Sequence, residues 1–242
     1  MLVVTLVGCC GARDDKPAPP VVHATPIDAV AVIADAVTAP IDQLKSIAVV
    51  DAPIKWTDER AALTLAYRRA HSDVKAGDLT IEPRVIVLHY TGGSSSRGTR
   101  DYFDNVRIEA SRPQLARAGA VNVSSHYLVD RDGTIFKLQP ETRFARHCIG
   151  LNHISIGVEN VGDGARWPLT DAQVAANVAL VRELAGRLPI THVLGHHEVM
   201  AFRDHAYYVE RDPKYQNDKP DPGAAFMKRV RGELADLQLS GL

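Results

Sequence analysis

The chain has 242 residues, of which 45% are hydrophobic and 24% charged, and this is the composition of an ordinary folded protein. Its 28 Lys and Arg residues nearly balance its 29 Asp and Glu residues, which gives a net charge of -1. That balance excludes a bulk positive field for nucleic acid or anionic lipid. The chain also lacks the run of about 18 apolar residues that a membrane-spanning helix needs. The only cysteines are Cys9, Cys10 and Cys148, which excludes a disulfide framework and a cysteine-only zinc site.

The N-terminus has the pattern of an envelope protein. Residues 1–8 form a short apolar, signal-like segment, and Leu6-Val7-Gly8-Cys9 resembles the bacterial lipobox, in which the signal is cleaved before the cysteine and the cysteine is acylated. Residues 9–47 are rich in Ala and Pro, as tethers are. We therefore expect a lipid anchor at Cys9, the sole membrane contact, on the periplasmic side of a bacterial cell envelope. The alternative is a frayed apolar terminus with two idle thiols.

From residue 48 onward the chain alternates helix and strand patterns. Residues 58–71 have the apolar stripe of a helix, and the β-branched run at 84–90 predicts a buried central strand. A short helix is expected at 99–106. The Asp-Gly pair in the turn at 130–133 predicts a hairpin, with strands at 126–129 and 134–138.

The C-terminal half continues the same alternation. A strand is expected at 154–160, and Thr170 with Gln173 forms the capping-box pattern that opens a helix. A short last strand at 192–195 precedes a closing helix that starts at Asp221. The sequence therefore predicts an α/β fold: one domain over residues 48–242 with a central mixed β-sheet flanked by helices, preceded by a lipoprotein-type signal and tether.

Histidine and aspartate stand where α/β folds place their sites. His89 ends the apolar strand at 84–90, His196 follows the last strand, and Asp221 opens the closing helix. A hydrolytic zinc site needs three protein ligands and one open position, which two imidazoles and a carboxylate would supply. Taken alone, each signal is weak, because a strand-end His is more often a hydrogen-bonded structural residue and an Asp before Pro a helix cap.

Six motifs follow one another between residues 84 and 235: Val87-Leu88-His89-Tyr90-Thr91, Ser124-Ser125-His126-Tyr127-Leu128-Val129 with Asp132-Gly133-Thr134, Arg146-His147-Cys148-Ile149-Gly150, Asn152-His153-Ile154-Ser155-Ile156-Gly157-Val158-Glu159, Gly195-His196-His197-Glu198 and Lys219-Pro220-Asp221-Pro222-Gly223. In this order they resemble the second type of zinc-dependent N-acetylmuramoyl-L-alanine amidase, a family that includes phage amidases and peptidoglycan recognition proteins.

The resemblance implies one Zn²⁺ held by His89, His196 and Asp221. His197 competes with His196 for the second place and would face the metal if the register slipped by one residue. Cys148 lies outside this set, and we expect it to be a buried thiol.

The resemblance also implies roles around the metal. Glu159 would be the general base and then the general acid, and Lys219 would stabilise the oxyanion. His147, Asn152 and Tyr90 are the candidates for substrate binding, with a structural role equally open for Tyr90. The segment at 200–218 carries Tyr207, Tyr208 and Tyr215, and it is interpreted either as a groove wall or as a packing insertion.

The predicted activity is zinc-dependent hydrolysis of the amide between N-acetylmuramic acid and L-alanine, in peptidoglycan or muropeptides, by a monomer that binds no nucleic acid. One alternative is a peptidoglycan-binding or recognition protein without catalysis. Another is a zinc amidase that acts on a different acylated peptide.

Overall fold

The computed structural model describes residues 47–241. The predicted signal and tether, with the anchor at Cys9, lie outside the described residues except for Ile47 and stay predictions. Within residues 47–241, no helix has both the length and the apolar composition to cross a bilayer.

The described chain folds around one six-stranded sheet with the strand order β1-β4-β3-β5-β2-β6. Only β3 and β4 pair in antiparallel fashion, as the predicted hairpin, and the other neighbours are parallel. This confirms the predicted α/β fold with a mixed sheet. The strands are β1 (Val49–Asp51), β2 (Val85–Tyr90), β3 (Tyr127–Val129), β4 (Ile135–Lys137), β5 (Ser155–Asn160) and β6 (His192–Gly195).

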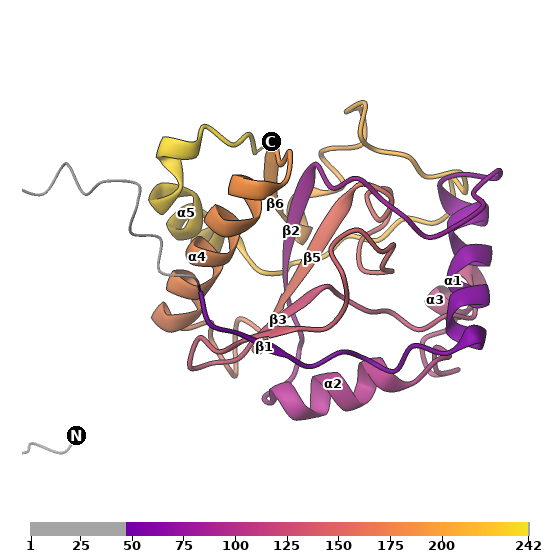
Figure 1. Ribbon diagram of the computed structural model, residues 1–242, viewed down its shortest axis with the longest axis horizontal. Helices are drawn as coiled ribbons and strands as arrows, with labels where there is room; N and C mark the ends of the chain where they lie inside the picture. Colours follow the sequence, from indigo (N-terminus) through magenta and orange to yellow (C-terminus); the bar gives the residue numbers. More distant parts are fainter. Residues whose placement is uncertain (1–46, 242) are drawn as a thin grey trace, which may run out of the picture. The chain divides into compact units, whose positions relative to one another are not determined.

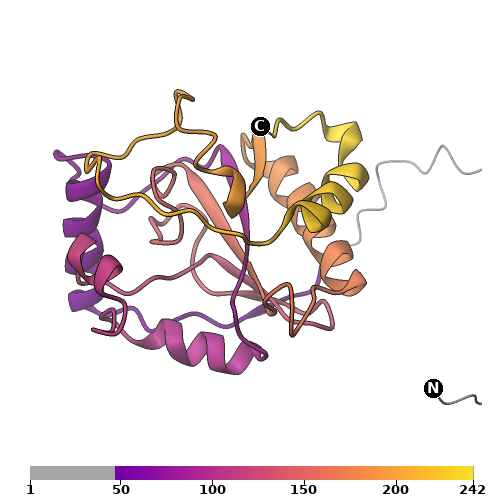
Figure 2. The same cartoon turned by 180° about the vertical axis from the view of Figure 1, so that it is seen from behind.

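Helices cover both faces of this sheet (Figures 1 and 2). The capping box that opens α4 is confirmed, because the Thr170 side chain accepts from Gln173 N and Gln173 accepts from Thr170 N. The α-helices are α1 (Asp58–His71), α2 (Ser96–Asp104), α3 (Pro113–Ala118), α4 (Asp171–Arg187) and α5 (Ala224–Glu233), with 3₁₀ turns η2 (His196–Glu198) and η3 (Ala235–Leu237).

Two predicted helix starts are wrong, and each has a local cause; the helix predicted at 99–106 also ends earlier, at Asp104. The helix expected at 99–106 begins at Ser96, because the Ser95 side chain caps it by accepting from Gly98 N at 3.1 Å. The closing helix begins at Ala224 and not at Asp221, because the Asp221 carboxylate faces two histidines and caps nothing.

Successive side chains of a strand point to opposite faces of the sheet, so alternate residues share a face. Ile86 and Leu88 of β2 pack with Ile156 and Val158 of β5 under α4 and α5. Val85 and Val87 face the other way, into a second cluster with Leu151 and Phe202. His89 follows the same alternation and therefore lies on the face away from α4 and α5.

The register of the parallel strands sets the place of the site. Strands β5, β2 and β6 are adjacent and parallel, so their carboxyl ends meet at one edge of the sheet. His89 pairs in register with Glu159, and His196 directly follows the last residue of β6. Three of the predicted site residues are thus brought together by strand pairing alone.

Candidate metal centre and active site

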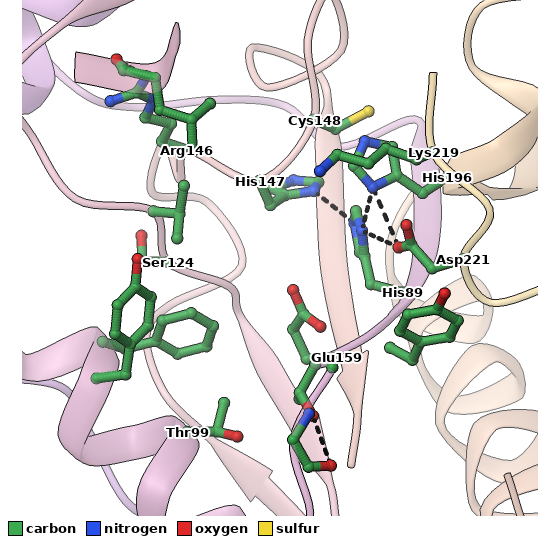
Figure 3. Close-up of a pocket in the computed structure, with 18 of the residues that line it drawn as sticks. His89, Thr99, Ser124, Arg146, His147, Cys148, Glu159, His196, Lys219 and Asp221 are labelled. Carbon is green, nitrogen blue, oxygen red and sulfur yellow. Dashed lines mark hydrogen bonds and ion pairs between the residues drawn. The ribbon is translucent and has the colours of Figure 1, made fainter. Parts of the chain in front are cut away.

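His89, His196 and Asp221 converge at this edge of the sheet (Figure 3). His89 Nδ1 lies 2.9 Å from His196 Nδ1 and 3.3 Å from Asp221 Oδ2, and His196 Nδ1 lies 3.1 Å from the same carboxylate oxygen. His89 is 2% exposed and Asp221 is 6% exposed. Three buried or half-buried donor atoms therefore face one point.

The turn after β6 orients His196 and not His197 toward that point. His197 N donates to the backbone oxygen of Asp221 at 2.8 Å, and His197 Nδ1 lies 3.2 Å from that oxygen. Glu198 holds the other side of the turn by accepting from Gly195 N at 2.7 Å. His197 thus positions the backbone of Asp221, while His196 reaches its carboxylate.

The donor set fits a zinc ion. Zinc with bonds of about 2.0–2.1 Å in a tetrahedral arrangement keeps neighbouring ligand atoms about 3.3 Å apart, close to the three separations in this group. Burial and the neighbouring His196 lower the pKa of His89 to about 4, which keeps its imidazole neutral, as a metal ligand requires. Although burial opposes ionisation of Asp221, its hydrogen bonds with His196 and His89 hold the pKa of that carboxyl well below its usual range. The group could therefore hold a metal ion.

Glu159 lies beside this group with an incomplete set of partners. Its Oε2 is buried and has no hydrogen-bond partner, and its carboxylate is directed into the cavity next to the triad (Figure 3). Burial and the charge of Asp221 raise the pKa of Glu159 to about 8, against the opposing charge of Lys219. A carboxylate poised to exchange a proton near neutral pH is suited to acid–base chemistry.

The other predicted residues occupy different surroundings. Lys219 and Tyr90 line the same cavity as the triad, and so does His147, which lies 3.1 Å from His89. Asn152 is not among the lining residues, because its Oδ1 accepts from the backbone N of His147 and of Cys148 at 2.8 and 2.7 Å. The expected burial of Cys148 is confirmed, at 2% exposed.

The cavity has a volume of about 550 Å³ and extends well beyond the triad. Its far wall includes basic and aromatic side chains that were not predicted from the sequence to belong to the site: Tyr67, Tyr102, Arg112 and Arg146. Arg146 belongs to one of the six sequence motifs, but no function was predicted for it. The others come from α1, α2 and the start of α3, and no spacing in the sequence connects them with His89.

The segment at 200–218 does both of the things proposed for it. Tyr207 and Tyr208 pack against the cluster of Val85, Val87 and Cys148, as a packing insertion would. Tyr215 lines the cavity, and its hydroxyl accepts from Arg146 Nη2 at 3.2 Å. Of the three tyrosines in this segment, Tyr215 alone lines the cavity.

Comparison with known protein families agrees with this geometry. The family model described as N-acetylmuramoyl-L-alanine amidase matches residues 79–224, more than half of the chain. The chain belongs to this family. The amidase match spans β2 to the residue that begins α5 and so includes all three residues of the triad, Glu159 and Lys219.

Individual relatives agree with the amidase family. Endolysins of Enterobacteria phage K11 and of Escherichia phage T7 are each 31% identical over 100 residues, which cover 39% of this chain and 66% of the endolysin. The chain thus spans a little under two thirds of the length of these curated relatives. A solved structure of the endolysin amidase LysCS from Clostridium intestinale shares the fold, with a TM-score of 0.50 and 19% identity, over 80% of this chain and 97% of that one.

Proposed function

We propose that this protein is a zinc-dependent amidase that hydrolyses the bond between N-acetylmuramic acid and L-alanine in peptidoglycan or muropeptides. The observation that carries the proposal is the convergence of two imidazole Nδ1 atoms and one carboxylate oxygen beside a buried carboxyl group, in a chain of the amidase family. His89, His196 and Asp221 are the proposed ligands of one Zn²⁺. The endolysins and the LysCS amidase among its relatives support the same activity.

The chemistry divides among the residues around the triad. A zinc ion held by His89, His196 and Asp221 would act as a Lewis acid, lowering the pKa of a water molecule and polarising the scissile carbonyl. Glu159 accepts the proton of the attacking water on a carboxylate oxygen and then delivers it to the nitrogen of the leaving L-alanine. Lys219, two residues before Asp221, offers an ammonium group to the negative charge that develops on the carbonyl oxygen.

The direct test is release of stem peptides from purified murein. The protein should release peptides with a new L-alanine amino terminus, lose this activity in a chelator such as 1,10-phenanthroline, and regain it when zinc is restored. Release of disaccharide fragments would indicate cleavage of a different bond. If murein is bound but no peptide is released with zinc present, the protein is a binding protein and the proposed activity is wrong.

A further inference from the structure

A line of polar side chains runs from His89 away from the triad and into the protein. His89 Nε2, the nitrogen that does not face Asp221, lies 3.1 Å from His147 Nδ1. His147 Nε2 lies 3.2 Å from Ser155 Oγ, and the Ser155 hydroxyl donates to the backbone oxygen of Leu151 at 2.7 Å. His89 and Ser155 are 2% and 0% exposed, so this line is shielded from water at both ends.

The hydrogen bonds of Ser155 determine which atom donates and which accepts at each step of this line. The only hydrogen of the Ser155 hydroxyl is used on the oxygen of Leu151, so Ser155 Oγ accepts a hydrogen bond from His147 Nε2. A neutral His147 that carries its proton on Nε2 has a bare Nδ1, which accepts from His89 Nε2. His89 must then present an unprotonated Nδ1, and this is the atom that faces His196 and Asp221.

The ring of His147 is also fixed in place. A Cβ atom on Gly157 would lie 2.7 Å from Cγ and Nδ1 of His147, so the ring rests directly on the backbone of β5. Asn152 holds the adjoining backbone through His147 N. The ring is therefore held in one orientation toward His89, as a residue that positions a neighbouring side chain must be.

We propose that His147 is a positioning residue for the metal ligand His89. By accepting from His89 Nε2, His147 selects the tautomer and the ring orientation in which His89 Nδ1 is the ligand atom. The inference rests on the proposed metal site, and it gives His147 a role other than the substrate contact predicted from the sequence. Hydrogen-bond partners of this kind typically change metal affinity by about 10–100-fold.

Two substitutions of similar size separate the roles. His147→Asn places its Oδ1 near the present position of Nδ1 and can still accept from His89, whereas His147→Leu fills the space without an acceptor. We expect zinc affinity, measured by competition with a chromogenic chelator, to fall about 10–100-fold in His147→Leu and by no more than a few-fold in His147→Asn. The visible spectrum of the Co²⁺-substituted protein should shift in His147→Leu and be retained in His147→Asn.

The outcomes distinguish this inference from the proposed function. If the wild-type protein binds no zinc, the metal site itself is wrong. If zinc affinity is equal in wild type and His147→Leu while KM for muropeptide rises, His147 is a substrate contact and the inference fails. Equal losses in the Leu and Asn variants would show that packing, and not the acceptor, matters.

Thermal unfolding in excess chelator controls for folding: both variants should unfold cooperatively there, with His147→Leu below the wild type because His89 Nε2 loses its acceptor. If His147→Leu does not fold, Ser155→Ala tests the next contact in the line, between His147 Nε2 and Ser155 Oγ. It removes the hydroxyl that receives the His147 proton, and a few-fold loss of zinc affinity is expected. An unchanged affinity in Ser155→Ala would contradict the proposed line of hydrogen bonds.

Discussion

The two ends of the cavity differ in how their side chains are held. At the metal end, His89, Glu159 and His196 stand at the ends of adjacent parallel strands, where register decides which side chains meet. At the far end, Arg112 directly precedes α3 and Arg146 lies between β4 and β5, and no strand pairing relates them to each other.

At the far end, hydrogen bonds to segments distant in sequence, and not strand pairing, hold the side chains in place. Arg146 Nη1 donates to the backbone oxygens of Gly119 and Val121 at 3.0 and 2.6 Å, and Nη2 donates to that of Leu115 at 2.7 Å. Arg112 Nη1 donates to the hydroxyl of Tyr102 at 2.8 Å. The metal end should therefore tolerate loss of one functional group without losing stability, whereas the far wall should not.

The largest effect expected at the metal end is on turnover. Glu159→Gln should lower kcat for peptide release by about 10²–10⁴-fold, because the amide keeps the shape of the side chain but cannot take the proton. Bound zinc, measured by elemental analysis, should be unchanged. The free energy of unfolding should not fall, because Glu159 Oε2 has no hydrogen bond to lose.

The matched control for this variant is Glu233→Gln, an exposed position on α5 that should leave turnover as it is. Near-normal turnover in Glu159→Gln would remove Glu159 from the mechanism. A large loss of stability in Glu159→Gln would instead mean that the metal end, like the far wall, depends on its functional side chains for stability.

The far wall should show the opposite pattern. Arg146→Met removes a buried guanidinium and leaves the backbone oxygens of Leu115 and Val121 without their donors. The free energy of unfolding, measured with urea, should fall by about 3 kcal/mol. Zinc affinity should stay the same, because Arg146 touches none of the three proposed ligands.

Arg117→Met provides the control, since Arg117 is an exposed residue of α3 and its change should stay within about 0.5 kcal/mol. Weaker zinc binding in Arg146→Met without a loss of stability would show that the far wall acts on the metal end, and the two ends would then not be held independently.

The same difference explains what the sequence could predict. The strand at 84–90 and the strand at 154–160 are readable from their own apolar runs, so the strand ends that carry His89 and Glu159 were predictable. The identity of the ligands came from the resemblance of the motifs to a family, and the structure brings those side chains together.

Other features depend on partners that no local pattern names. Strand β1 was not predicted, because its three exposed residues become a strand only by pairing with Ile135 to Lys137, more than 80 positions later. Arg112 was missed because its place in the wall depends on how α2 and α3 pack. The contact of His147 with His89 likewise depends on ring positions that a motif does not encode.

The smallest expected effect concerns the contact that fastens the segment at 200–218 to α1. His71 Nδ1 lies 2.8 Å from Glu210 Oε1, and His71 Nε2 lies 2.6 Å from the backbone oxygen of Ala118. Both ring nitrogens face acceptors, which favours the doubly protonated ring. Although burial opposes the charge, the hydrogen bonds to Glu210 and Ala118 raise the pKa of His71 above its ordinary value of 6.5.

A raised pKa in the folded state sets the sign of the pH dependence. The stabilisation by this pair is complete below the ordinary pKa of histidine, and it is lost as pH rises through the higher pKa of the folded state. A double-mutant cycle of His71→Gln and Glu210→Gln should therefore give a coupling energy of roughly 1 kcal/mol at about pH 6 and much less at about pH 9. Zinc affinity should be unchanged throughout. A coupling that grows with pH would mean that the His71 ring is neutral in the folded protein, and that packing of Tyr215 against His71, and not charge, fastens the segment at 200–218 to α1.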